Sequence, residues 1–325
     1  MTRWAMAVYT EIADEQVAAF VAEYDIGRVV ACKGIAEGIE NTNYLLVTDR
    51  GPYILTLYEK RVRVEDLPYF LALMEHLASR DIPCPTPVHG RDGEALRQCA
   101  GRSAAIVTFL NGMWPRRPTA RHCAGVGEAL ARLHLAGAEF PMMRPNSLSL
   151  GGWRKLLGAI GTGGESVHAE LLEELEDEMQ VLEREWPNSL PTGVVHADLF
   201  PDNVFFEQDN LSGLIDFYFA CTDILAYDLA ICLNAWCFET DGSFNVTKAR
   251  RLFTGYQGVR QLRPEEREAV PLLARGAAMR FLLTRLYDWV NTPKSAMVTR
   301  KNPMEYLQKL RFHRHAPSPA AYGLD

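Results

Sequence analysis

Two short apolar segments joined by a polar turn constrain this chain more than any other feature. Residues 204–206 and 213–215 are apolar, and residues 207–210 between them are polar, a pattern that predicts a β-hairpin. In such a hairpin Asn203 and Asp216 would lie opposite each other at the open end, with Asp198 on the loop just upstream. An amide oxygen and a carboxylate suit Mg²⁺, and a second carboxylate can accept a proton from a hydroxyl group.

The spacing of these residues therefore predicts a site for phosphate transfer from a magnesium-nucleotide complex. The alternative is an ordinary exposed hairpin whose acids are solvated. That alternative requires three polar residues to match both the spacing and the topology by chance.

The same segment resembles the catalytic loop of protein kinases, in which H-x-D-x-x-x-x-N is followed by a strand and D-F. Here the pattern runs from His196 to Asn203 and then to Asp216. Two positions differ, because Ala197 replaces an arginine and Tyr218 replaces a glycine. The A-P-E signature is also missing, and the chain continues directly into a predicted helix.

With these departures from the protein-kinase pattern, the chain resembles the aminoglycoside phosphotransferase and choline kinase family of small-molecule kinases. The resemblance covers the chain from about Val8 to Ala316. Three stretches are similar to the homoserine kinase branch of that family: VVHADLFPDNVFF, LSGLIDFYFACTDILAYDLAICLNAWCFE and DGSFNVTKARRLFTGY.

The resemblance implies transfer of the ATP γ-phosphate to the hydroxyl of L-homoserine, a step of threonine biosynthesis, with ATP and Mg²⁺ as cofactors. Asp198 would act as the base, Asn203 and Asp216 would hold the metal, and His196 and Asp228 would support the loop. Three alternatives stay open. A protein kinase is disfavoured because the activation and peptide-docking segments are missing, and the other two remain within or close to the resembled family. One is a kinase for another small alcohol, such as choline, an aminoglycoside or methylthioribose, and the other is an inactive kinase-like module that only binds its ligand.

The fold implied is α+β and protein-kinase-like, with a small sheet-rich lobe and a large helical lobe. We expect a nucleotide-binding lobe at residues 1–108, a hinge at 109–112 and a catalytic lobe at 113–316. Residues 317–325 have no core pattern and are predicted to be disordered. A long helix is predicted at residues 167–186, with an acidic face that is most simply explained as solvated.

Nucleotide contacts are predicted in the first lobe. A loop with two glycines precedes a strand pair, which could bring backbone N–H groups to the phosphates, although such loops are often plain turns. Kinases and many members of the resembled family have a lysine or arginine in the second strand, where this chain has a neutral threonine. The candidate nucleotide-binding residues are Gly34, Gly38, Asn41, Asn43, Thr56, Thr108, Phe109 and Leu110.

Substrate contacts are predicted mainly on the last long helix, at about residues 264–289. A substrate that is an amino acid needs a cation for its carboxylate, and arginine forms two parallel hydrogen bonds with that group. Arginines on a helix also commonly form surface ion pairs. Arg280 and Arg285 are the leading candidates, and Tyr218, Asn234 and Asp288 are further candidates.

Composition excludes several classes of protein. The net charge of −7 disfavours a nucleic-acid partner, and no apolar run approaches the length of a membrane span. Seven scattered cysteines without a C-x-x-C pair are typical of reduced thiols in a cytoplasmic enzyme. Nothing in the sequence fixes the oligomeric state, and Met6 is an alternative start to Met1.

Overall fold

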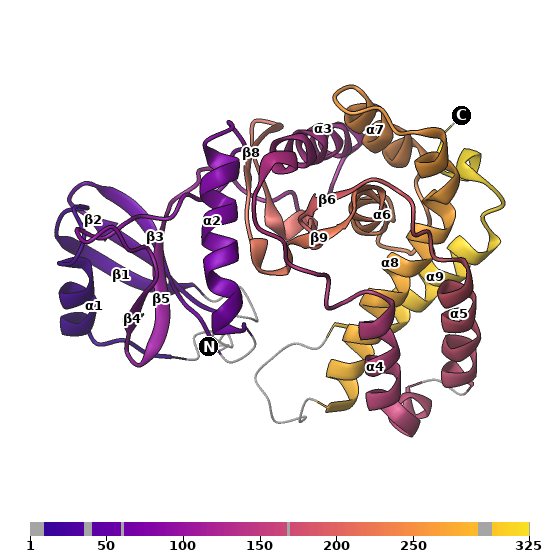
Figure 1. Cartoon of the computed structure of the whole chain (residues 1–325), viewed down its shortest axis with the longest axis horizontal. Helices are drawn as coiled ribbons and strands as arrows, with labels where there is room; N and C mark the ends of the chain where they lie inside the picture. Colours follow the sequence, from indigo (N-terminus) through magenta and orange to yellow (C-terminus); the bar gives the residue numbers. More distant parts are fainter. Residues whose placement is uncertain (1–9, 36–40, 60–61, 168–169, 292–300, 325) are drawn as a thin grey trace. The chain divides into compact units, whose positions relative to one another are not determined.

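A computed structural model describes residues 10–35, 41–59, 62–167, 170–291 and 301–324 (Figure 1). It contains two compact units. Unit 1 comprises Met1–Gly112 with Gly213–Tyr218, and unit 2 comprises Met113–Ser212 with Phe219–Asp325. The first boundary lies at the end of the hinge predicted at residues 109–112. In the part of the chain that the model describes, no helix is both long and apolar enough to span a membrane.

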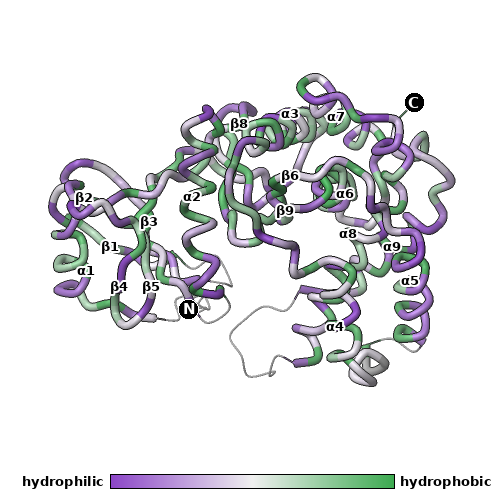
Figure 2. Tube along the Cα trace, viewed as in Figure 1, coloured by the Kyte–Doolittle hydropathy of each residue, from purple (hydrophilic) through white to green (hydrophobic). Residues whose placement is uncertain are grey.

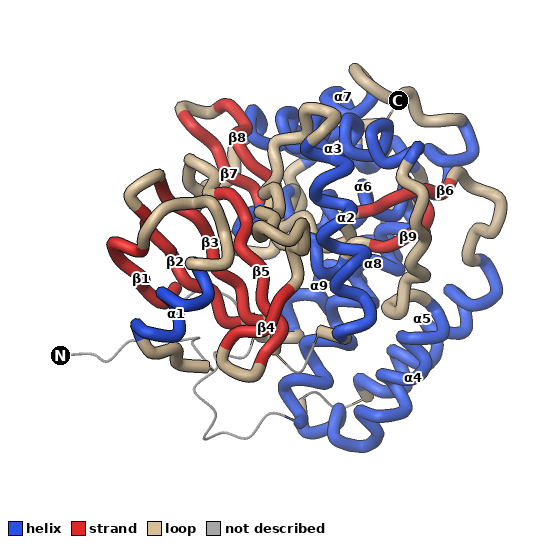
Figure 3. Tube along the Cα trace, turned by 60° about the vertical axis from the view of Figure 1, so that its left-hand side comes forward, coloured by secondary structure: helices blue, strands red, loops and turns tan. Residues whose placement is uncertain are grey.

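Unit 1 is built on an antiparallel five-stranded sheet in the order β1-β2-β3-β5-β4 (Figure 3). Alternate residues of β2 are buried and half-buried, as expected of a strand with two different faces. The strands are β1 (Val29–Ile35), β2 (Thr42–Thr48), β3 (Gly51–Leu57), β4 (Arg97–Cys99) and β5 (Arg102–Thr108).

Two helices flank this sheet, α1 (Asp14–Val21) on one face and α2 (Leu67–Ala78) on the other (Figure 1). The apolar core between α1 and the sheet includes Phe20, Leu46 and Leu55. Because side chains alternate between the two faces of a strand, the residues next to Leu46 and Leu55 in the sequence face away from that core. This opposite face includes one cross-strand row that matters below: Ile35, Asn43, Thr56 and Ala105.

Unit 2 is mostly helical. In the tube coloured by hydropathy, α5 shows both hydrophilic and hydrophobic positions along its length (Figure 2). The helices are α3 (Ala120–Ala136), α4 (Leu150–Ile160), α5 (Leu171–Glu185), α6 (Leu225–Trp236), α7 (Val246–Gln257), α8 (Pro264–Asn291) and α9 (Met304–His315). Two short strand pairs accompany them: β6 (Thr192–Val195) with β9 (Cys221–Ile224), and β7 (Val204–Glu207) with β8 (Asn210–Leu214).

Two glycines allow α3 and α7 to pack closely. A Cβ atom on Gly127 would lie 2.0 Å from the carbonyl oxygen of Leu252 on α7. Reciprocally, a Cβ atom on Gly255 would lie 2.0 Å from the carbonyl oxygen of Ala124 on α3. Any larger residue at either position would force the helices apart, so close packing requires glycine on both sides.

The predicted hairpin is present as β7 and β8, but its turn is shorter than expected and consists of Gln208 and Asp209 alone. Residues 207 and 210, predicted to lie in the turn, end β7 and begin β8, and β8 stops at Leu214. Both turn residues have positive φ angles, 48° and 67°. Two consecutive left-handed residues form the turn that matches the natural twist of a two-residue hairpin, and aspartate tolerates that conformation. The polar turn was therefore identifiable from the sequence, although it contains no glycine.

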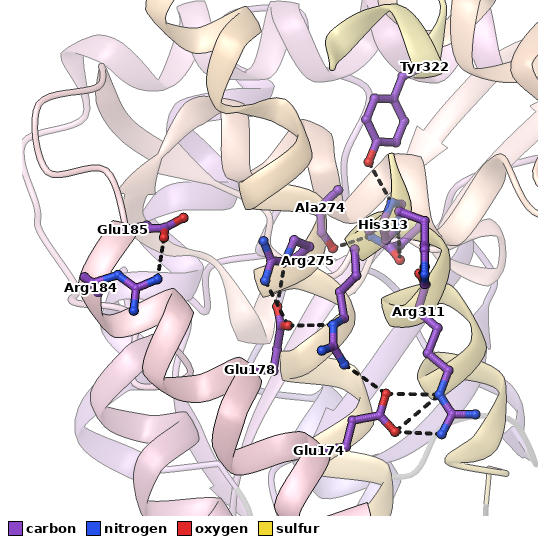
Figure 4. Close-up of polar contacts among 12 residues, drawn as sticks. Glu174, Glu178, Arg184, Glu185, Ala274, Arg275, Arg311, His313 and Tyr322 are labelled. Atoms are coloured by element: carbon purple, nitrogen blue, oxygen red, sulfur yellow. Dashed lines mark hydrogen bonds and ion pairs between the residues drawn. The ribbon is translucent and has the colours of Figure 1, made fainter. Parts of the chain in front are cut away.

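The sequence predicted that the acidic face of α5 would be solvated, but two of its glutamates form ion pairs with other helices. Glu174 forms ion pairs with Arg311 (2.6 Å) and Arg314 (3.1 Å) of α9 (Figure 4). Glu178 is only 1% exposed and pairs with Arg275 of α8 (2.7 Å). These acids attach α5 to the two last helices. A buried carboxylate left without its arginine would be strongly destabilising.

The tail also differs from the prediction of disorder. Residues Pro319–Tyr322 form a 3₁₀ turn, and the Tyr322 side chain is fully buried. Its hydroxyl group lies 3.0 Å from Nδ1 of His313 on α9 (Figure 4). The sequence signal was weak because the tail has few anchoring residues, and the hydrogen-bond partner of Tyr322 lies on another element.

The hydrogen bonds around His313 determine its tautomer. The Asn234 amide donates both protons, to the carbonyl oxygens of Ala230 and Ala274. Its oxygen must therefore accept from His313 Nε2, 3.1 Å away, and Nδ1 accepts from the Tyr322 hydroxyl. Burial lowers the pKa of His313 to about 3, and Lys309 and Arg275 act in the same direction.

This pKa predicts a pH dependence of stability. The unfolded chain binds a proton at His313 near pH 6.5, whereas the folded protein does not until about pH 3. The contribution of His313 to the free energy of unfolding is therefore complete above pH 6.5. It decreases as the pH falls, by at most ~1.4 kcal/mol per pH unit. We would measure the free energy of unfolding by urea for wild type and His313→Gln between pH 8 and pH 5. This free energy should fall less steeply with decreasing pH in the variant than in wild type. His315→Gln, an exposed histidine on the same helix, is the control, and equal slopes for wild type and His313→Gln would contradict the expectation.

Candidate active site

The loop that carries Asp198 is held by the carboxylate of Asp228. Asp228 is fully buried on α6 and accepts backbone N–H bonds from His196 (2.7 Å) and Ala197 (2.8 Å). Ala197 has a φ angle of 63°, a left-handed conformation that costs a non-glycine residue roughly 1–3 kcal/mol. Two charge-assisted hydrogen bonds to one buried carboxylate offset that cost and fix the direction of the backbone entering Asp198.

Two side chains from other helices support Asp228. His134 of α3 approaches the carboxylate with Nε2 at 3.2 Å, and its Nδ1 lies 2.7 Å from the Tyr256 hydroxyl of α7. Burial alone would raise the pKa of Asp228, but hydrogen bonds from His134 and the loop outweigh it, and the pKa is lowered. The carboxylate is thus kept ionised. Neither His134 nor Tyr256 was identified from the sequence, because only the packing of α3 against α7 brings them to α6.

Arg280 contacts the same loop from α8. It is 1% exposed, and its guanidinium group donates a hydrogen bond to the carbonyl oxygen of Ala197. The group also lies 4.5 Å from the centre of the Phe281 ring. Arg280 was predicted to bind a substrate carboxylate. Its described hydrogen bond is to the loop that carries Asp198, and its contact with a substrate stays a prediction.

Asn203 lies in the 3₁₀ turn Pro201–Asn203 and is 8% exposed. Its amide nitrogen donates to the backbone oxygen of Asp198 (2.8 Å) and lies 3.3 Å from that residue's carboxylate. This orientation turns the amide oxygen, a hard metal ligand, away from the carboxylate. Asp198 and Asn203 belong to unit 2, whereas Asp216 belongs to unit 1 and has a φ angle of 66°.

The donor set fits Mg²⁺. One amide oxygen and one carboxylate from Asn203 and Asp216 are oxygen ligands of the kind that magnesium prefers together with phosphate oxygens and water. In the described parts of the chain, no group of three or more histidine, cysteine, aspartate or glutamate residues could hold a metal ion by itself. The joint binding of one Mg²⁺ ion by Asn203 and Asp216 stays a prediction.

The predicted nucleotide contacts fall into different environments in unit 1. Asn41 is 3% exposed and accepts from the backbone N–H of Glu59 (3.3 Å), which indicates a structural role. Asn43 is half-buried and faces Thr56 across the strand pair. Gly34 lies in β1 opposite Tyr44, and Gly38 lies outside the described residues.

At the predicted hinge, Thr108 ends β5 and is tied to the proline-rich crossing segment. Its backbone N–H donates to the carbonyl oxygen of Thr86, and its hydroxyl accepts from the Thr86 N–H, both at 2.9 Å. Phe109 is 39% exposed, and Leu110 is half-buried. The contact of these residues with an adenine ring stays a prediction.

Three predicted substrate residues have structural partners in unit 2 or lie at its surface. Asn234 is fully buried, with its amide engaged as described above. Arg285 pairs with Glu305 of α9 (2.6 Å) and lies 4.4 Å from the Tyr306 ring. Asp288 is half-buried on α8.

The fourth candidate, Tyr218, lies in unit 1. Its hydroxyl is 3.4 Å from that of Tyr58, and its ring meets the Phe70 ring edge-to-face at 5.6 Å. These contacts place Tyr218 beside Tyr58, which directly follows β3, and Phe70 of α2. Several predicted nucleotide contacts lie in the same unit.

A family model described as the phosphotransferase enzyme family matches residues 31–262. The chain belongs to the phosphotransferase enzyme family. This membership confirms the resemblance found in the catalytic segment, and the matched range contains Asp198, Asn203, Asp216 and Asp228. Arg280 lies beyond that range, on α8.

Two relatives from this family match over nearly their entire length. A homoserine kinase from Paramagnetospirillum magneticum is 62% identical over 326 residues, covering 98% of this chain and 100% of that protein. A homoserine kinase from Rhodospirillum rubrum is 65% identical over 319 residues, covering 98% and 99%.

Solved structures confirm the predicted fold class. A structure of an amicoumacin kinase in complex with AMP-PNP and Ca²⁺ matches with a TM-score of 0.71 and 17% identity, covering 93% of this chain and 92% of that one. A choline kinase from Cryptosporidium parvum matches with a TM-score of 0.65 and 16% identity, covering 92% and 96%. The α+β, protein-kinase-like fold expected from the sequence is therefore the fold of this chain.

Replacing Asp228 should test the support of the loop. Asp228→Asn keeps the size of the side chain but puts an amide donor next to a backbone N–H, so one loop contact is lost. A misplacement of about 1 Å can cost about 10²-fold in rate, and we expect kcat of the phosphotransfer reaction to fall on that order with little change in KM. Asp223→Asn, an acid-to-amide change on β9 at a residue bonded to Asn146 and not to the loop, is the control. Unchanged turnover in Asp228→Asn would refute the role.

Arg280 offers a second test, because binding and positioning predict different kinetics. Arg280→Met leaves the Ala197 carbonyl oxygen without its donor, which costs about 1–3 kcal/mol of stability. A positioning role predicts a lower kcat with KM for the acceptor nearly unchanged, and partial rescue by Arg280→Lys. A large increase in that KM at an unchanged kcat would instead show that Arg280 binds the acceptor.

Proposed function

We propose that this chain is an ATP-dependent homoserine kinase that forms O-phospho-L-homoserine in threonine biosynthesis. The observation that carries the proposal is identity of 62% and 65% to homoserine kinases over 98% of the chain. The intact loop around Asp198 supports it, since its backbone is held by Asp228 at two points. An ATP-consuming step of amino-acid synthesis would take place in the cytoplasm.

In this proposal Asp198 orients the hydroxyl group of homoserine and accepts its proton, a role that contributes roughly 10²–10⁴ in rate. Asn203 fixes the Asp198 carboxylate through its amide nitrogen and keeps its oxygen available for a metal ion. Mg²⁺ held by Asn203 and Asp216 would neutralise charge on the transferred phosphate. The departing proton and the phosphoryl group thus meet different protein groups.

Charges in unit 2 favour an acceptor that carries a carboxylate. The buried phenol of Tyr306 feels the charges of Arg280, Arg285, Glu305 and Asp198. A third cation, Lys309, lies 4.4 Å from the Tyr306 ring. Around Tyr306 three cations therefore meet two acids, Glu305 and Asp198, and this excess of positive charge suits an amino acid carboxylate better than a purely cationic alcohol such as choline.

Two of these cations, Arg285 and Lys309, share one acidic partner, Glu305. Lys309 is 6% exposed and bonds to Glu305 (2.8 Å), which also pairs with Arg285. Burial lowers the pKa of Lys309, and Glu305 opposes that change. Burial raises the pKa of Glu305, but Lys309 and Arg285 lower it by more. One shared acid therefore stabilises two like charges beside Tyr306.

The test is release of ADP by the purified protein with ATP, Mg²⁺ and one acceptor at a time. The acceptors are L-homoserine, L-serine, choline, methylthioribose and an aminoglycoside. We expect turnover with L-homoserine that exceeds every other acceptor, that is lost on chelation of Mg²⁺, and that is lost in Asp198→Asn. Mass spectrometry of the product should show phosphorylation at the side-chain hydroxyl.

Other outcomes would change the conclusion in defined ways. Turnover with choline or an aminoglycoside, but not with L-homoserine, would overturn the substrate and keep the phosphotransferase chemistry. Turnover that persists in Asp198→Asn would overturn the role of that residue. No ADP release with any acceptor would favour an inactive binding module.

A further inference from the structure

Kinases hold the nucleotide phosphates with a lysine on a strand of the small lobe and pair that lysine with a glutamate on the next helix. Here β3 has no lysine, and the glutamate of α2 has a different partner. Thr56 occupies the strand position in β3 and is 2% exposed. Glu75, the acid of α2, is hydrogen-bonded to Nε2 of His89. The phosphates then need other partners, such as a polar side chain or backbone N–H groups.

Thr56 and Asn43 form a pair across β2 and β3. They are directly opposite in the register, on the sheet face away from the α1 core. The Thr56 hydroxyl donates to the amide oxygen of Asn43 at 2.8 Å. With its oxygen engaged, the Asn43 side chain presents its NH₂ group, which has two protons to donate, on the side away from Thr56.

Tyr218 connects this pair to the predicted metal ligand within the same unit. It follows Asp216 by two residues, and its hydroxyl interacts with the side chains of both Thr56 and Tyr58. Its ring packs against the rings of Tyr58 and Phe70. Asn43, Thr56 and Tyr218 therefore form a continuous polar connection from β2 to the segment that carries Asp216.

We propose that Asn43, oriented by Thr56, donates its amide N–H groups to the nucleotide phosphates in place of the strand lysine. The inference rests on the proposed function only in so far as that function requires ATP. An amide donor is weaker than an ammonium group, but it is held in one direction by a buried hydroxyl, so little freedom is lost on binding. Tyr218 keeps this donor and Asp216 in a fixed relation.

Lys33 is the competing candidate. It lies on β1, opposite Leu45 and one row from Asn43 on the same face of the sheet, and it is exposed. It could reach a phosphate as a flexible cation. The test therefore includes this residue.

The experiment measures dissociation constants for Mg-ATP, for ATP with a chelator, and for adenosine, by calorimetry without any acceptor. Asn43→Asp keeps the bond from Thr56 and replaces the donor by a carboxylate, whereas Thr56→Val removes the hydroxyl that orients the amide. We expect Asn43→Asp to weaken ATP binding roughly ten- to hundredfold, with or without the metal, because a hydrogen bond to a charged group is lost. Thr56→Val should act in the same direction with a smaller factor, and adenosine binding should stay within about twofold.

The control is Thr48→Val. Thr48 is a buried threonine of the same strand pair, 4% exposed, whose hydroxyl donates to the Ile26 carbonyl oxygen (2.5 Å) on the face packed against α1. It should lose stability as Thr56→Val does, yet keep the ratio of ATP to adenosine affinity. That ratio separates loss of a phosphate contact from general damage to the sheet.

Three results would overturn the inference. Unchanged ATP affinity in Asn43→Asp would exclude the donor, as would an equal loss for ATP and adenosine. A loss of ATP affinity in Lys33→Met together with normal binding in Asn43→Asp would assign the contact to Lys33. Because no acceptor is present, these results do not depend on whether L-homoserine is the substrate.

Discussion

The buried carboxylate of Asp228 is the interaction on which the catalytic half of the structure depends. It fixes two successive N–H groups of a left-handed turn, and this turn determines where the Asp198 side chain begins. Four helices contribute to that arrangement: α6 provides the carboxylate, α3 and α7 support it through His134 and Tyr256, and α8 provides Arg280. Asp198, the predicted base, thus lies on a loop, but the position of its backbone is set by helices that pack around one charge.

The two units differ in the charge found at their candidate site residues. In unit 2 the ion pairs are numerous and linked, as in Glu174 and Glu178 with their arginines or Glu305 with Arg285 and Lys309. In unit 1 the position where kinases place a cation is occupied by neutral side chains joined by hydrogen bonds. If the proposed amide donor binds the nucleotide, binding should be less sensitive to ionic strength than binding by an ammonium group.

The sequence predicted local features well and long-range partners poorly. The hairpin, the loop spacing and the first sheet follow from residues close in the chain, and the structure contains all three elements. The environment of Arg280 did not follow, because the face that a helix turns to its neighbours depends on packing against segments 83 residues away. The acids of α5 were interpreted as solvated for the same reason, since Glu174 finds its arginine 137 residues later.

The crossing of α3 and α7 connects sequence drift to catalysis. Gly127 and Gly255 allow backbone atoms of the two helices to touch, and His134 and Tyr256 are carried on these same helices. A methyl group added at either glycine would separate the pair that supports Asp228, although neither glycine is near the reacting atoms. Evolution of this chain is therefore constrained at two positions that no inspection of the catalytic motif would single out.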